Sequence, residues 1–171
     1  KILSADNLSA IQTAAGASYY RFVGIEISAK STVTESSSLV MLGSYSETNV
    51  TNQAHHIIFD RTYVHGVPGA NTRRGFFLNS GVTAIVDSYL SEFHDSGADA
   101  QAILGDNGPG PLKVQNNYLE ASGENFLIGG VDAAIPGVQM SDVEVRGNLI
   151  AKPLSWRNGP WVIKNLLELK A

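Results

Sequence analysis

The stretch KVQNNYLEASGENFLIGG, residues 113–130, consists of two strand-like runs joined by a short polar bend. In the first run, alternating apolar residues lead to Asn117, which is followed by an aromatic residue and a leucine. The same order of side-chain types returns along the chain, with Thr62, Ser88 and Asn148 at the polar position. The steps between these four positions are 26, 29 and 31 residues. A recurring unit of this size predicts a repeat architecture.

The second run of each unit repeats as well, as an apolar triplet closed by glycine or asparagine. The copies are VMLG at 40–43, FFLN at 76–79, AILG at 102–105 and FLIG at 126–129. Both runs alternate with a period of two, are rich in β-branched and aromatic residues, and stop at glycine, asparagine or proline. These features predict an all-β fold and argue against helices.

Equivalent positions keep the same kind of side chain from copy to copy, which an antiparallel sandwich does not require. In a parallel β-solenoid, each turn of chain lies ~4.8 Å above the last and equivalent side chains stack. We therefore expect the four polar residues to form a hydrogen-bonded ladder, since single buried polar groups are unfavourable. An aromatic column should lie beside it, formed by Tyr63, Tyr89 and Tyr118.

Composition narrows the classes of function. The net charge of −4 and the scattered basic residues argue against nucleic acid as a partner, because phosphate binding needs a basic patch. The absence of cysteine excludes disulfides, a thiolate nucleophile and zinc–thiolate sites. No apolar stretch reaches the roughly 18 residues of a membrane span.

Three stretches, VQNNYLEASG, VRGNLIAKP and VTAIVDSYLSEF, resemble coils of right-handed parallel β-helix proteins of the pectate-lyase-like superfamily. Further stretches, among them HHIIFDRTYVHG and ANTRRGFFLNSG, resemble an uncharacterised bacterial group of β-helix-repeat proteins. The resemblance implies a single right-handed β-helix domain over residues 1–171, with about five to six coils. It also implies a secreted or cell-surface bacterial protein that handles polysaccharide, by analogy of fold.

The chain ends at Ala171, where another coil should begin, and neither terminus shows a capping helix. We therefore expect a piece of a longer solenoid. Open end coils would then permit end-to-end association through unpaired strand edges.

On a solenoid, function is expected on stacked loops at one side of the strands. Aligning the second runs stacks the loops that precede three of them, VHGVPGANTRRG, EFHDSGADAQ and EASGEN, together with AKPLSWRNGPWVIKN. These loops hold the densest collection of ionisable side chains in the chain. The predicted site residues are Arg73, Arg74, His94, Lys152, Asp99 and Glu124 for catalysis, and His65, Gln101, Asn125, Trp156 and Arg157 for substrate binding.

A lyase acting on uronate polymers needs a base, a group that neutralises the carboxylate and an acid. Arg73 or Arg74 would clamp the carboxylate, and Lys152, His94 or His65 would be the base. A calcium-assisted variant would use carboxylates at 95, 99 and 124, whereas a hydrolase would pair those at 99 and 124. No other metal or cofactor is expected.

Structural roles compete with each of these assignments. Arg73 and Asp99 would form an ion pair between neighbouring coils, and Trp156 would pack on the core instead of stacking on a sugar. Two classes of function therefore remain: a polysaccharide-active enzyme, and a non-enzymatic solenoid that binds glycans or builds a surface. The enzyme requires basic side chains converging along a groove, whereas the binding solenoid has its ionisable groups paired off.

Overall fold

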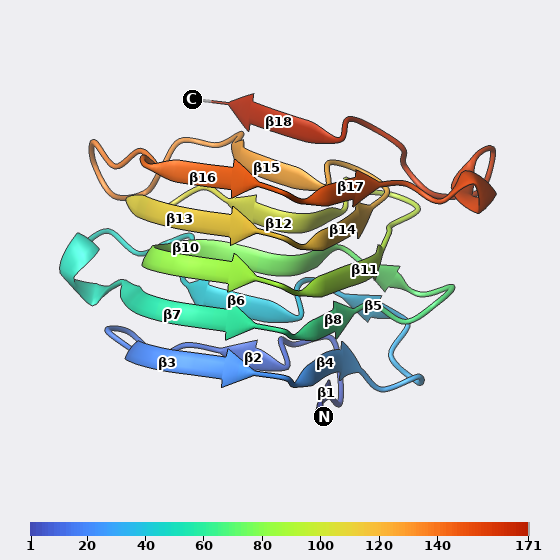
Figure 1. Ribbon diagram of the computed structural model, residues 1–171, viewed down its shortest axis with the longest axis horizontal. Coiled ribbons are helices and arrows are strands. Elements are labelled where there is room, and N and C mark those ends of the chain that lie inside the picture. The colour runs from blue at the N-terminus through green and yellow to red at the C-terminus, as the bar shows by residue number, and fades with distance from the viewer. Residues whose placement is uncertain (171) are drawn as a thin grey trace.

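The computed structural model describes residues 1–170, which form 18 β-strands and two short 3-10 helices, Val50–Asn52 and Leu154–Trp156. All strand pairings among these residues are parallel. Figure 1 shows the strands of successive coils lying above one another. Neither helix is long and apolar enough to cross a membrane. The all-β class and the parallel sheets were both predicted from the repeat.

The first face of the solenoid, sheet A, contains one short strand from each coil. In spatial order the strands are β1 (Ile2–Ser4), β4 (Glu26–Ala29), β8 (Tyr63–His65), β11 (Tyr89–Phe93), β14 (Tyr118–Ala121) and β17 (Leu149–Ala151).

The other two faces share the long strand β10 (Arg74–Val86), whose first half belongs to sheet B and whose second half belongs to sheet C. Besides β10, sheet B contains β2 (Ile11–Gln12), β6 (Val40–Gly43), β12 (Gln101–Gly105), β15 (Phe126–Gly129) and β18 (Leu167–Lys170). Sheet C contains, with β10, β3 (Ser18–Val23), β7 (Ala54–Asp60), β13 (Gly110–Gln115) and β16 (Val143–Arg146).

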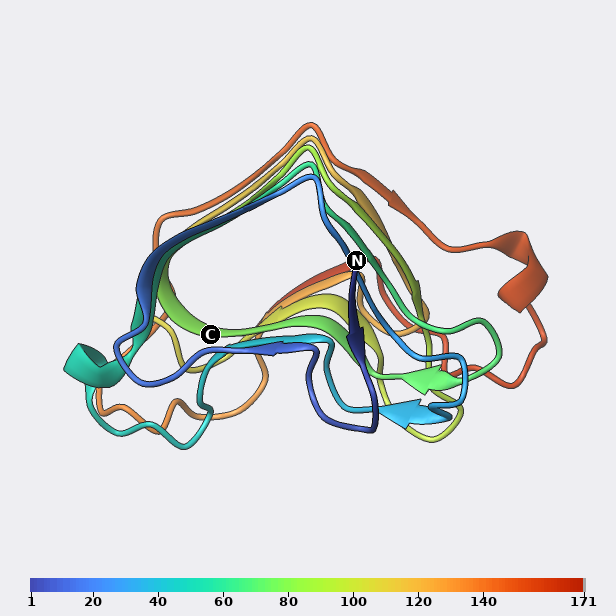
Figure 2. The same cartoon turned by 90° about the horizontal axis from the view of Figure 1, so that it is seen from below.

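Viewed along the stack, the coils superimpose as a triangle whose upper vertex is the same sharp bend in every coil (Figure 2). This vertex joins sheet C to sheet A. Its bend residue has a left-handed conformation in each coil, with φ from 52° to 66° at Gly24, Arg61, Asp87, Asn116 and Gly147. A single left-handed residue reverses the chain so tightly that no loop is needed.

The predicted polar ladder occupies the position directly after this bend. Ser88 Oγ lies 3.0 Å from Thr62 Oγ1 and accepts from Thr62 N, while Asn117 Oδ1 accepts from Ser88 N at 2.9 Å. Asn148 Oδ1 accepts from both the backbone N and the side-chain Nδ2 of Asn117. Each asparagine also donates to a carbonyl of the sheet C strand in the preceding coil: Asn117 to Ile85 O, and Asn148 to Val114 O. The ladder thus satisfies the buried polar groups of the bend.

The tyrosine column lies beside the ladder on the outer face of sheet A. Tyr63, Tyr89 and Tyr118 are register partners, and the rings of Tyr89 and Tyr118 stack at 4.3 Å with an interplanar angle of 10°. Tyr63 meets Tyr89 edge-on at 5.8 Å, and both of these tyrosines remain exposed. The column therefore stabilises the stack and leaves part of its aromatic surface in contact with solvent.

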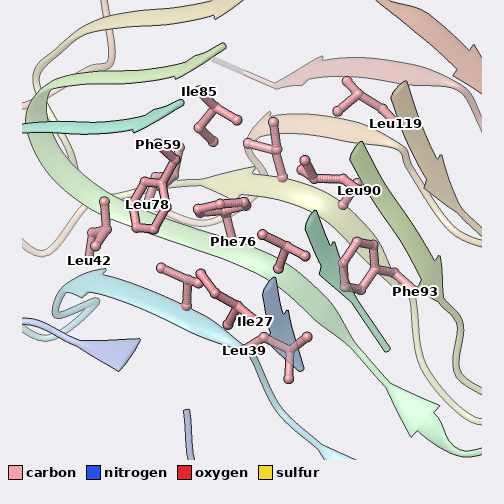
Figure 3. Packing of buried hydrophobic residues seen from close by; sticks show 14 of the residues in the cluster. Ile27, Leu39, Leu42, Phe59, Phe76, Leu78, Ile85, Leu90, Phe93 and Leu119 are labelled. Carbon is pink, nitrogen blue, oxygen red and sulfur yellow. The ribbon is translucent and has the colours of Figure 1, made fainter. Parts of the chain in front are cut away.

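The core fills the triangle with apolar side chains from all three sheets. Figure 3 shows Phe59, Phe76, Leu78 and Ile85 meeting Leu90 and Phe93 inside the coil. Phe59 stacks on Phe22 at 4.7 Å and meets Phe76 edge-on at 4.8 Å. Stacked apolar columns of this kind follow directly from the period-two pattern, since one face of each strand points inward.

The glycine or asparagine that closes each apolar triplet also has a structural cause. Gly43 has φ of 70°, and a Cβ there would collide with the backbone carbonyl of Asn79, its register partner in the next coil. Gly129, with φ of 83°, would collide in the same way with Lys170 O. At these two corners the residue must therefore accept a left-handed backbone and a close neighbouring strand, whereas Asn79 and Gly105 close their triplets without a left-handed backbone.

Replacing Asn117 by leucine should destabilise the protein by about 2–4 kcal/mol, because Ser88 N and Ile85 O would lose their partners inside the bend. Chemical denaturation followed by circular dichroism measures the effect. The control is Gln115→Ala, on the outer face of sheet C, with an expected cost below about 0.5 kcal/mol. Equal stability of the Asn117 variant and the control would contradict a structural role for the ladder.

Candidate functional site

The loops that carry most of the predicted site residues lie at the corner between sheets A and B, on the right of Figure 2. Four such loops precede β6, β10, β12 and β15, and a fifth, residues 152–166, precedes β18. The first two contain the short strands β5 (Glu35–Ser36) and β9 (Asn71–Thr72), which pair in parallel. The corner therefore continues the register of the sheets into its loops.

A polar cleft of about 450 Å³ opens on this pair of strands. It spans the loops of four successive coils and is lined by Asn7, Glu35, Ser36, Ser37, Asn71, Arg73, Asp95, Ser96 and Gly97. Hydroxyl, amide, carboxylate and guanidinium groups thus meet in one place. Of the residues predicted as site residues, Arg73 and Asp95 lie here.

Several polar groups of the cleft are fixed by the loops. Arg73 Nε donates to the backbone carbonyl of Asp99 at 3.3 Å, and Asn71 Oδ1 accepts from Ser96 N at 3.2 Å. Asp95 Oδ1 accepts from the backbone N of Gly97 at 2.8 Å. Among residues 1–170, the terminal nitrogens of Arg73, Nδ2 of Asn71 and Oδ2 of Asp95 have no hydrogen-bond partner.

Other polar groups of the cleft have no protein partner. The carboxylate of Glu35 is exposed and makes no hydrogen bond or ion pair within residues 1–170. Ser36 is 5% exposed, and its hydroxyl is buried without a hydrogen-bond partner in the same part of the chain. A buried hydroxyl without a partner is costly, so a ligand or water that satisfies it is favoured.

Next to the cleft, the predicted catalytic carboxylates are neutralised. Lys164 Nζ lies 2.7 Å from Asp99 Oδ2 and 3.2 Å from Glu124 Oε1, and Gln101 Nε2 donates to Glu124 Oε2 at 2.8 Å. Hydrogen bonds to Asp99 and then Glu124 raise the pKa of Lys164. The lysine therefore occupies the position between the two carboxylates that a scissile bond would need in a hydrolase.

The expected ion pair between Arg73 and Asp99 is not formed, because Arg73 bonds the Asp99 backbone and the carboxylate binds Lys164. Lys164 was not predicted to be a site residue, because it is separated from Asp99 by 65 residues in the sequence. Only the fold of the last long loop brings the two together.

Lys152 serves the same corner as a structural cation. Its Nζ has three N–H groups and lies within hydrogen-bonding distance of four oxygens, the carbonyls of Ala121, Ser122 and Gly123 and, at 2.9 Å, Asn125 Oδ1. Burial lowers the pKa of Lys152 to about 8, against the opposing effect of Glu124. The ammonium is directed at protein oxygens, so it ties the loop before β15 instead of facing the cleft.

His94 is 1% exposed and lies beneath the last long loop. Its ring stacks on Trp161 at 3.9 Å and meets Trp156 edge-on at 5.2 Å, and its Nε2 lies 3.1 Å from Glu92 Oε2. Trp156 is itself only 7% exposed, so it packs on His94 as the structural alternative predicted. Neither side chain lines the polar cleft.

The remaining predicted residues are dispersed. His65 pairs with Glu26 at 3.0 Å and stacks on Tyr63 on the outer face of sheet A. The Arg74 guanidinium lies 4.8 Å from the centre of the Phe77 ring, and burial, followed by repulsion from Arg73, lowers the pKa of Arg74 to about 10. Arg157 is exposed on the last long loop.

The residues expected to hold calcium are not gathered into a site. Among residues 1–170, no three histidine, cysteine, aspartate or glutamate side chains form a group that could hold a metal ion. Asp95 faces the polar cleft, whereas the carboxylates of Asp99 and Glu124 meet Lys164.

The sequence contains a signal for the residues that were missed in the cleft. Glu35 and Ser36 precede the apolar triplet at 40–43, as Asn71 and Arg73 precede the one at 76–79. Stacking the loop of this earlier coil on the next would have placed them together.

Comparison of the chain with family models, curated proteins and solved structures gives no match.

Replacing Lys152 by methionine should destabilise the protein by about 2–4 kcal/mol, because several buried oxygens would lose their donor. Lys30→Met is the control, since Lys30 is exposed and its side chain has no partner within residues 1–170. Both are measured by urea unfolding. If Lys152 had no structural role, the free energy of unfolding of the Lys152 variant would be unchanged.

Proposed function

We propose that this protein is a non-enzymatic, polysaccharide-binding solenoid, and that its fold is the right-handed parallel β-helix of the pectate-lyase-like type. The observation that carries the proposal is the pairing of the ionisable groups beside an open polar cleft. Lys164, Lys152 and His94 each have close protein partners, while the cleft next to them keeps unpaired hydrogen-bonding groups. We further propose that the protein is secreted or held at a bacterial cell surface.

The composition of the cleft suits a ligand rich in hydroxyl groups. Asn71 and Ser96 supply amide and hydroxyl groups, Arg73 supplies donors, and Glu35 and Asp95 supply acceptors. Such a mixture binds sugars through directed hydrogen bonds, with each coil adding ~4.8 Å to the length of the site. A cleft over four coils favours a linear chain of sugars over a single small molecule.

Lyase activity is the second candidate, supported by the placement of Arg73 in the cleft, where it would neutralise a uronate carboxylate. What this candidate lacks is a side chain in the cleft that could act as the base. No histidine, lysine or tyrosine is among the lining residues of the cleft in the described chain. Ultraviolet absorbance of the unsaturated product, recorded with uronate polymers with and without calcium, distinguishes the two candidates: a time-dependent rise establishes elimination.

The binding proposal predicts that Asn71→Ala combined with Arg73→Gln weakens binding to a retained polysaccharide at least tenfold, since two sets of hydrogen bonds are lost. Affinity electrophoresis in gels containing different soluble polysaccharides identifies a retained polymer and measures its dissociation constant. Arg146→Gln, on the outer face of sheet C, removes the same charge and should bind normally. Absence of retardation in every gel, or equal affinity of the cleft variant and the control, contradicts the proposal.

A further inference from the structure

The balance of charge in the polar cleft points to the kind of sugar it takes. We propose, on the basis of the function proposed above, that the cleft binds amino-sugar polysaccharides in preference to uronate polymers. This reverses the preference for acidic substrates that the resemblance in the sequence implies. The cleft contains two carboxylates, Glu35 and Asp95, and one guanidinium, Arg73.

The carboxylate of Glu35 is the strongest feature for a cationic ligand. It is exposed, and no basic side chain pairs with it within residues 1–170. Arg73 is the one basic residue that lines the described cleft, and its Nε is already engaged by Asp99 O. An ammonium group on a sugar would therefore find an acceptor that the protein leaves unsatisfied.

Asp95 supplies a second acceptor, and the geometry of its loop holds it in place. Its Oδ1 accepts from the backbone N of Gly97 at 2.8 Å and of Ala98 at 2.9 Å, which fixes the carboxylate and leaves Oδ2 for a ligand. A preorganised acceptor loses little conformational entropy on binding. The two carboxylates belong to different coils, so neighbouring sugars of one chain can reach them.

The other polar groups of the cleft fit the remaining atoms of an amino sugar. Arg73 and Nδ2 of Asn71 are donors suited to ring hydroxyls and to the carbonyl oxygen of any acetylated unit. The hydroxyl of Ser36 is buried and has no partner in the described chain, so it is an unsatisfied polar group in the wall of the cleft.

A uronate polymer meets the opposite situation. Each of its carboxylates would enter beside Glu35 or Asp95, with only Arg73 to compensate, and like charges at short range are unfavourable. The protein as a whole carries a net charge of −4, so its long-range field also repels a polyanion and attracts a polycation.

The test uses the whole chain and three hexasaccharides, of glucosamine, of N-acetylglucosamine and of galacturonate, titrated by calorimetry in mildly acidic buffer. There the sugar amine is protonated and ordinary carboxyl groups stay ionised. The glucosamine hexamer should bind tightest, and Glu35→Gln should weaken it about threefold or more, with little change for the acetylated hexamer. Added salt should reduce the preference.

Asp132→Asn is the matched control, because Asp132 is an exposed acid on the loop before β16, away from the cleft. Asp95→Asn is a second test, since the amide oxygen can still accept from Gly97 N. Tightest binding of the galacturonate hexamer, or equal loss with Glu35→Gln and Asp132→Asn, would overturn the inference and leave glycan binding intact. Failure of all three hexamers, together with the gels described above, would remove both proposals.

Discussion

The polar ladder at the sharp vertex is the constraint on which the rest of the structure depends. Each coil bends there at one left-handed residue, and after four of the five bends a polar side chain follows that is hydrogen-bonded to its equivalent in a neighbouring coil. Shifting one coil by one residue would leave several of these groups without partners and turn the core side chains outward. The ladder therefore fixes the register of all three sheets.

Because the register is fixed, the position of the corner between sheets A and B is the same in every coil, while the lengths and side chains of its loops vary. The loops between sheets A and B differ in length (Figure 2), yet they begin and end on strands in register. Their side chains therefore meet across coils. In the later coils, charges are used to secure the loops, through Lys152 and Lys164. In the earlier coils the polar groups remain open, and there the cleft is found.

The sequence was sufficient to predict what repeats. The parallel sheets, the ladder and the tyrosine column all follow from side-chain types that return at equivalent positions. Contacts that occur in only one coil could not be predicted in this way. Lys152 bonds backbone carbonyls, whose position no side-chain type reveals, and Lys164 contacts Asp99, which is 65 residues away in the sequence. Grouping Arg73, His94 and Lys152 in one site was an expectation based on proximity in the stack, whereas only Arg73 lines the cleft.

The register of the stack is tested most directly by cysteine cross-linking, because the chain contains no cysteine of its own. Lys113 and Glu144 are register partners on the outer face of sheet C, and Arg146 lies two residues further along the same strand. Paired parallel strands are ~4.8 Å apart, within the Cα range of about 4.4–6.8 Å for a disulfide, whereas the offset pair is roughly 8 Å apart. Under mild oxidation, Lys113→Cys with Glu144→Cys should cross-link rapidly, and Lys113→Cys with Arg146→Cys slowly. The reverse order of rates would contradict the stacked register and the cleft that depends on it.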